Sequence, residues 1–128
     1  GISCIKKNRI LVFNDQEISS SICAVQQYSK GILALTKNGI LFQLELVDDT
    51  IQLINKKLLK TTTSSSFHQL KIKDNSIYVC SDEGLLEIDK NLSIKKHLFK
   101  GKKITDFCWD KERNMLLLFY NKILLNNE

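Results

Sequence analysis

Two pairs of adjacent carboxylates, Asp48-Asp49 and Asp82-Glu83, are the residues best placed in this sequence to do acid–base chemistry. Paired acids can act as general acid and general base when apolar surroundings tune their pKa values. Both pairs lie in polar turn sequences, where Asp and Glu favour solubility and local hydrogen bonding. The chain also contains no G-x-S-x-G, H-E-x-x-H or G-x-x-x-x-G-K motif. We therefore predict that the protein is not an enzyme.

The histidines and cysteines give no metal-binding pattern. His68 and His97 stand apart from each other, and the four cysteines include no C-x-x-C pair. Each cysteine lies in an apolar or alternating run, which is typical of a small buried hydrophobic residue. We predict reduced structural thiols, exposed histidines, no metal, no cofactor and a cytoplasmic or nuclear protein. The cysteines are Cys4, Cys23, Cys80 and Cys108.

Lysines form the clearest charge pattern in a chain of net charge +5. No acidic residue occurs between Lys90 and Thr105, and another acid-free stretch runs from Thr50 to Lys73. We expect these lysines to line outer strands and to form a basic rim. Such a rim protects an edge strand from aggregation, or it contacts an anionic membrane or an acidic partner. Nucleic acid is less favoured, because arginines and interleaved aromatic residues are absent from the stretch. The candidate contact residues are Lys95, Lys96, Lys100, Lys102 and Lys103.

The elements that position these side chains are predicted to be β-strands. Apolar runs at 31–35 and 40–46 flank Asn38-Gly39, the dipeptide most typical of a tight hairpin turn with positive φ. Similar hairpins are predicted at 76–89 and 115–125. No stretch keeps the apolar spacing of a helix over three turns. We therefore predict an all-β chain. Gly39→Val should destabilise the chain more than Gly84→Val, because the 81–84 loop is longer and can readjust.

The strands recur as a unit of about 40–50 residues, in which an apolar inner strand precedes a tight turn and a polar outer strand. This spacing favours a β-propeller segment of about two full blades with partial blades at either end. A β-trefoil and a small sandwich are the alternatives at this length. The predicted blade units span residues 2–21, 22–61, 65–103 and 104–128, within one domain.

The position of the single tryptophan fits packing between such units. Trp109 precedes Asp110, but the pair falls on the first strand of its unit and does not match the register of WD repeats. We expect Trp109 to pack between blades, since a large aromatic side chain is readily buried there. Propellers typically have about four to eight blades. We therefore expect the chain, which starts with Gly1, to be part of a longer polypeptide.

The stretch from residue 3 to residue 46 resembles the CNH (citron-homology) type of propeller. The resemblance rests on a lysine-rich strand, IKKNRILVF, followed by GILALTKNG. Propellers of this type cap subunits of vacuolar and endosomal tethering complexes, where they bind small GTPases or partner subunits. The resemblance implies a protein–protein interaction scaffold in a large assembly for vesicle or vacuole tethering. It also implies a place on the endolysosomal or vacuolar membrane surface. The alternative is a propeller subunit of a nucleic-acid-associated processing or repair complex.

Overall fold

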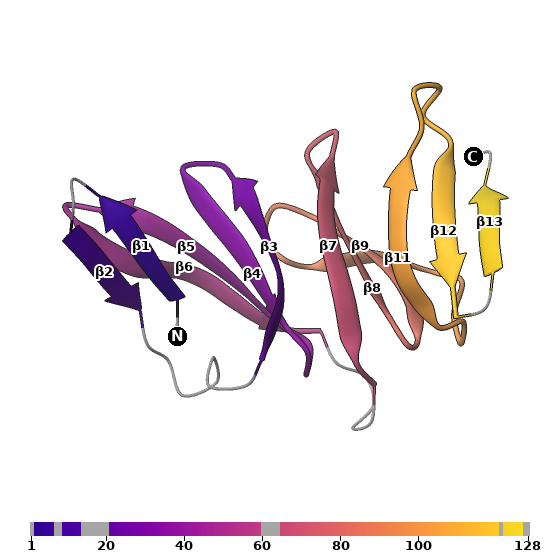
Figure 1. Cartoon of the computed structure of the whole chain (residues 1–128), viewed down its shortest axis with the longest axis horizontal. Coiled ribbons are helices and arrows are strands. Elements are labelled where there is room, and N and C mark those ends of the chain that lie inside the picture. The colour runs from indigo at the N-terminus through magenta and orange to yellow at the C-terminus, as the bar shows by residue number, and fades with distance from the viewer. Residues whose placement is uncertain (1, 7–8, 14–20, 60–64, 121, 127–128) are drawn as a thin grey trace.

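The computed structural model describes residues 2–6, 9–13, 21–59, 65–120 and 122–126, and these residues are built from β-strands (Figure 1). No helix occurs in these ranges, so the prediction of an all-β chain is confirmed. The described residues accordingly include no helix that could span a membrane.

The strands form four antiparallel sheets, each made of strands consecutive in sequence. The first sheet pairs β1 (Ile2–Lys6) with β2 (Arg9–Phe13). The second contains β3 (Ile22–Tyr28), β4 (Gly31–Thr36), β5 (Ile40–Val47) and β6 (Thr50–Leu58), in that order. The third contains β7 (Phe67–Lys73), β8 (Ser76–Ser81), β9 (Gly84–Ile88) and β10 (Ile94–Leu98). The fourth contains β11 (Ile104–Trp109), β12 (Met115–Phe119) and β13 (Lys122–Asn126).

Neighbouring sheets pack face to face along the long axis of the molecule, and three apolar clusters fill the spaces between them (Figure 1). Along β4, Leu33 and Leu35 point toward the third sheet, whereas Ala34 belongs to the cluster beneath the first sheet. Successive side chains of a strand point to opposite faces, so a strand covered on both faces must be apolar throughout. This arrangement explains the unbroken run GILALT. The first strand of the second sheet, β3, lies beside β7, and β7 lies beside β11 (Figure 1).

Several turns use residues that accept positive φ. Asp48 and Asp49 have φ of 50° and 64°, and Asp74 and Asn75 have φ of 51° and 67°. Both pairs join strands by two-residue turns, and the polar sequence predicts the turn at Asp48-Asp49. The Asn38-Gly39 prediction is wrong in one respect, because only Gly39 has positive φ, at 89°.

The comparison of Gly39 with Gly84 stays a prediction, because an added Cβ at Gly39 would also lie close to a neighbour, 2.5 Å from the Phe67 ring. Its premise, a longer 81–84 loop, is wrong. Ser81 pairs directly with Gly84, so the turn contains only Asp82 and Glu83. Gly84 has a φ of 127°, and an added Cβ would lie 2.6 Å from the backbone oxygen of Leu98. The end of β10 therefore packs closely against the β8–β9 turn.

Candidate interaction surface

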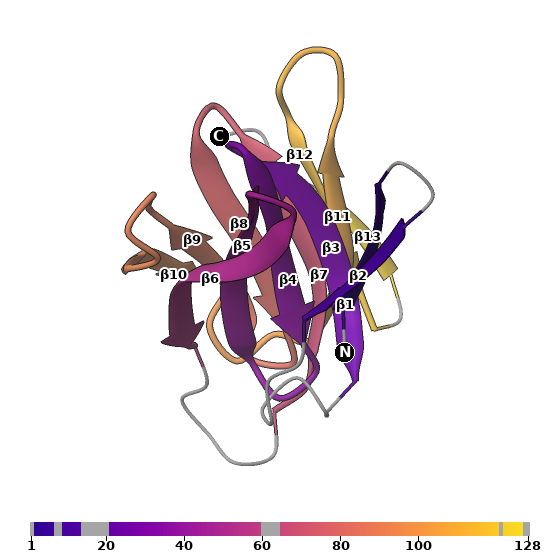
Figure 2. The same ribbon diagram turned by 90° about the vertical axis from the view of Figure 1, so that its left-hand side faces the viewer.

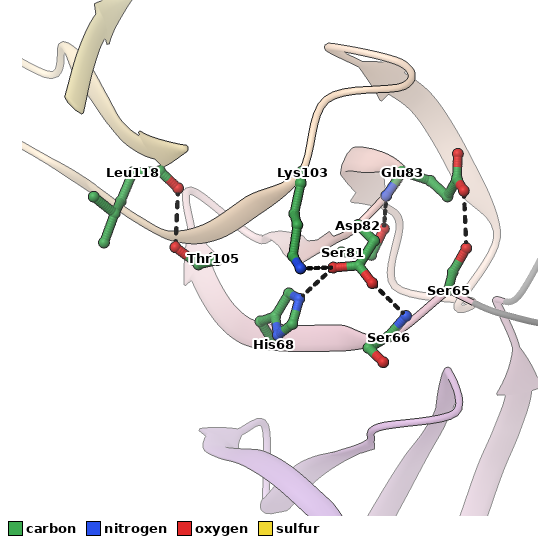
Figure 3. Close-up of polar contacts among 9 residues, drawn as sticks. All are labelled: Ser65, Ser66, His68, Ser81, Asp82, Glu83, Lys103, Thr105 and Leu118. Atoms are coloured by element: carbon green, nitrogen blue, oxygen red, sulfur yellow. Dashed lines mark hydrogen bonds and ion pairs between the residues drawn. The ribbon is translucent and has the colours of Figure 1, made fainter. Parts of the chain in front are cut away.

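The Asp82-Glu83 turn is the centre of a polar network at one end of the third sheet (Figure 3). The Nε2 atom of His68, on β7, lies 2.7 Å from Oδ1 of Asp82. The backbone amide of Ser66 donates a hydrogen bond of 3.1 Å to Oδ2 of the same carboxylate. The Nζ atom of Lys103 approaches Oδ1 to 3.9 Å from the β10–β11 connection. Three separate segments therefore meet at one carboxylate.

Glu83 extends the network through both its side chain and its backbone. The hydroxyl of Ser65 donates to Oε1 of Glu83 at 3.1 Å, and the Glu83 amide donates to the hydroxyl of Ser81 at 3.0 Å. The carbonyl oxygen of Glu83 accepts hydrogen bonds from Nε2 of His97 at 2.8 Å and from the Gly101 amide at 3.0 Å. The turn is thereby tied to the end of β10.

This geometry corrects two predictions from the sequence. His68 and His97 are half-buried and hydrogen-bonded, although both were expected to be exposed. The hydroxyl-rich run TTTSSS at 61–66 predicts a surface loop, but Ser65 is buried; residues 61–64 lie outside the described ranges. The serines were missed because their contacts come from a turn that follows them by more than a dozen residues.

The pKa of the Asp82 carboxyl reflects competing influences. Partial burial alone would raise this pKa, because burial penalises the charged form. The hydrogen bonds from His68 and the Ser66 amide, with the charges of His68 and Lys103, outweigh that effect. The pKa of Asp82 therefore lies below its ordinary value, and the carboxylate is a stable anion at neutral pH. A carboxylate in this state is poorly suited to donate a proton.

The network also leaves little room for a substrate. Beside it lies a cavity of about 10 Å³, lined by Leu59, Ser65, Phe67, Ser81, Glu83, Leu86 and His97. A cavity of this size holds at most one water molecule. The described residues contain no group of three or more His, Cys, Asp and Glu side chains that could hold a metal ion. The arrangement is suited to holding β7, the β8–β9 turn and the end of β10 together.

The five candidate contact lysines fall into two groups. Lys95, on the edge strand β10, pairs with Glu87 at 3.1 Å, and Lys103 pairs with Asp82 and lies 4.9 Å from the centre of the Tyr120 ring. The other three are exposed and form no ion pair with the described residues. These three, which we call the free lysines, are Lys96, Lys100 and Lys102.

The second acid-free stretch does not form the expected rim as a whole. Lys56 and Lys57 lie on the outer strand β6, but Lys71 and Lys73 lie on β7, the first strand of its sheet. Lys71 pairs with Asp106 at 3.5 Å, and Lys73 lies 5.3 Å from the centre of the Trp109 ring. Lys60 lies outside the described ranges. A stretch without acidic residues in the sequence can therefore lie beside acidic residues in the folded chain.

Trp109 packs between sheets, as predicted. Its ring makes an edge-to-face contact with Tyr78 of the third sheet, with ring centres 5.1 Å apart. A second edge contact, at 5.6 Å, joins it to Phe107 on its own strand. Trp109 therefore belongs to the packing between the third and fourth sheets and not to a binding platform.

The described cysteines are free thiols, in two different environments. Burial raises the pKa of the Cys80 thiol to about 12 and also raises that of Cys23, so both are inert at neutral pH. Cys108 is exposed, which corrects the prediction that its apolar run buries it. The side chain of Cys4 lies outside the described part of the structure.

One groove is a feature that the sequence did not indicate. It has a volume of about 760 Å³ and runs between the ends of the second and third sheets. Its polar lining comes from three turns that are far apart in sequence, so no local motif could reveal it. The lining residues are Gln27, Tyr28, Ser29, Ile72, Asn75, Asp89, Lys90 and Lys95.

Comparison with known proteins adds no assignment: no family model matches the chain, and no curated protein matches it.

Proposed function

We propose that the chain is a β-propeller segment that serves as a non-catalytic interaction scaffold in a large multi-subunit assembly. Each sheet follows its predecessor in sequence and packs face to face against it, and the first strands of the second, third and fourth sheets lie beside one another in that order. Four-stranded antiparallel sheets in radial repetition are the construction of propeller blades. This regular stacking is the observation that supports the fold part of the proposal.

The use of the reactive side chains supports the scaffold part. The Asp82-Glu83 pair and both histidines are engaged in joining β7, the β8–β9 turn and the end of β10. What remains for a partner is an open polar groove and the free lysines. Broad, polar, positively charged surfaces suit protein partners with acidic faces. The partners we propose are other subunits of the assembly and a small GTPase.

The resemblance of residues 3–46 to the CNH propeller extends the proposal to tethering of vesicles or vacuoles. In this view the protein is cytoplasmic and lies peripherally on an endolysosomal or vacuolar membrane. The free lysines then contact anionic lipid, with the gain in binding that basic residues bring near a charged surface.

The test is a binding titration of the purified chain against a panel of endolysosomal small GTPases. Each GTPase is loaded with GDP or with a non-hydrolysable GTP analogue, and binding is followed by interferometry at two salt concentrations. We expect one or more GTPases to bind in a nucleotide-dependent manner. Replacement of Lys90, which lines the open groove, by Glu should weaken that binding. Lys111→Glu, at an exposed turn of the fourth sheet, is the matched control.

Two results would overturn the proposal. The first is the absence of any nucleotide-dependent partner in the panel. The second is tight binding of RNA or DNA that falls steeply with salt, which would favour the nucleic-acid-associated alternative.

A further inference from the structure

The groove of about 760 Å³ lies in the middle of the row of sheets, between the second and the third. Residues of the β3–β4 turn, the β7–β8 turn and the β9–β10 loop line it. β3 and β7 run in the same direction, so the turns that follow them lie at the same end of the molecule, which is uppermost in Figure 1 and Figure 2. The volume of the groove lies within the range of ligand-binding clefts.

The position of the groove separates it from the ends of the described chain segments. The described chain enters β3 at Ser21 and β7 at Ser65, at the opposite ends of these seven-residue strands, about 20 Å from the groove. Chain that adjoins the first or the fourth sheet would lengthen the row at its ends. The second and third sheets would still form the groove between them.

Part of the groove lining is apolar. Tyr28 and Ile72 line the groove, and both also pack against the apolar cluster between the second and third sheets. Both side chains are only partly buried, so the edge of this cluster is open to the groove. An apolar side chain of a ligand that entered here would extend the cluster and lose its own contact with water.

The polar lining has unused hydrogen-bonding capacity. The side chains of Gln27, Ser29 and Asn75 line the groove and form no hydrogen bond with the described residues. Side-chain amides carry an acceptor and two donors, and a hydroxyl can both donate and accept. Such groups match the backbone N–H and C=O groups that an extended polypeptide presents along its length.

The charged lining contains one cation without a counter-ion. Lys95 pairs with Glu87 at 3.1 Å. Oδ1 of Asp89 accepts two hydrogen bonds of 2.9 Å from backbone amides of its own loop. Lys90 is exposed and forms no ion pair with the described residues. A carboxylate on the ligand would therefore complement the charge of Lys90.

We propose that this groove binds an extended segment of a partner protein in which an acidic residue lies beside an apolar one. The apolar side chain inserts between Tyr28 and Ile72, and the carboxylate pairs with Lys90. The backbone of the segment bonds to the amide of Asn75 and to the polar side chains across the groove. The proposal rests on the scaffold function, because the segment belongs to a partner, but it requires no folded GTPase.

The probe is selected from a phage-displayed library of random linear peptides on the immobilised chain. We expect the enriched peptides to share an acidic residue next to an aliphatic or aromatic residue. The most enriched peptide is then synthesised with blocked termini and a fluorescent label. Its dissociation constant is measured by fluorescence anisotropy at two salt concentrations. A peptide with the same composition in scrambled order is the control and should bind more weakly.

The charge contact is tested by reversal on both sides. Lys90→Glu should weaken binding about tenfold, because it replaces an attraction by a repulsion. Replacing the acidic residue of the peptide by Lys should restore binding to this variant. Lys111→Glu changes the net charge equally at an exposed turn of the fourth sheet and should leave the dissociation constant unchanged.

The other contacts are tested by two smaller changes. Asn75 has a φ of 67°, so Asn75→Gly removes the amide without straining the turn, and it should weaken binding about threefold. Ile72→Ala should weaken binding about tenfold by removing apolar surface. Val25→Ala is its control, since Val25 is 50% exposed on β3 and does not line the groove. Thermal unfolding verifies that each variant is folded at the temperature of the titration.

Three outcomes would overturn the proposal. The first is a selection that enriches no common motif. The second is an enriched peptide whose binding is unaffected by both Lys90→Glu and Asn75→Gly, because it would bind elsewhere. The third is displacement of the peptide by inorganic phosphate, which would make the groove an anion site.

The GTPase titration separates this proposal from the proposed function. If a GTPase binds in a nucleotide-dependent manner while no peptide is enriched, the scaffold function stands and the segment is overturned. If the peptide binds as expected while no GTPase does, the groove keeps its assignment and the GTPase partner is lost.

Discussion

The imidazole of His68 and the carboxylate of Asp82 lie 2.7 Å apart and join β7 to the β8–β9 turn across the third sheet. Because the network lowers the pKa of Asp82 from 3.8, folding favours the ionised form of this carboxylate. The stabilisation from Asp82 is fully present above the pKa that its carboxyl has in the unfolded chain. It is lost as the pH falls through the lower pKa of the folded state.

The first prediction follows from this sign. Asp82→Asn should lower the free energy of unfolding at pH 7 by about 1–2 kcal/mol, because hydrogen-bond donors lose a charged acceptor. The difference from the parent should shrink as the pH falls below 3.8. Denaturant unfolding at a series of pH values measures both effects. Glu112→Gln, at an exposed turn, is the control and should leave the pH profile unchanged. A constant difference down to the lowest pH would show that the ionised carboxylate is not the stabilising species.

The glycines of two turns, Gly84 and Gly101, give the second prediction. At Gly84 an added Cβ would lie 2.6 Å and 2.7 Å from backbone oxygens of Leu98 and Phe99, which cannot move aside easily. At Gly101 an added Cβ meets nothing within 4 Å, so only its φ of 77° opposes substitution. Gly84→Ala should therefore destabilise by about 3 kcal/mol or more, and Gly101→Ala by about 1 kcal/mol. Urea unfolding of both variants measures the difference, and equal losses would contradict the close approach.

Local patterns were sufficient to predict the strands but not the contacts between segments. Alternation and turn dipeptides predict the positions of the strands, since both depend on residues within a few positions of each other. Gly84 is restricted by the backbone oxygens of Leu98, the last residue of β10, and of Phe99, which follows it, and no local pattern predicts this close approach. His68 and Ser65 were misjudged for the same reason, because the Asp82-Glu83 turn reaches them only in the folded chain.

The outward face of the fourth sheet gives the third prediction. Leu118 is 40% exposed there, opposite Asp106 in the register, and Leu116 and Cys108 pair on the same face. These residues line a hollow of about 310 Å³. Exposed apolar patches promote association, so we expect the isolated chain to self-associate through this face. Leu118→Lys should reduce the sedimentation coefficient at high protein concentration under reducing conditions, and Val25→Lys should not. A parent chain that is monomeric at all concentrations would contradict this prediction and favour a closed fold.

The lysines of the β10 edge and the following turn give the last prediction, in which the paired and free residues behave differently. Replacing the free lysines Lys96, Lys100 and Lys102 by Gln should change the free energy of unfolding by no more than about 0.5 kcal/mol each, since all three are exposed. Each lysine near an anionic surface contributes about 1 kcal/mol to membrane binding, so the triple variant should lose vesicle affinity by about a hundredfold.

Lys95 and Lys103 provide the matched comparison, because their charges are already paired with Glu87 and Asp82. Their replacement by Gln should weaken vesicle binding less per residue than replacement of the free lysines, while it removes two ion pairs from the third sheet. Co-sedimentation with neutral and phosphatidylserine-rich vesicles at two salt concentrations measures the binding. If the parent shows no preference for the anionic vesicles, the membrane contact must be abandoned. The lysines would then serve to protect the β10 edge from strand-to-strand association, as charged residues on edge strands commonly do.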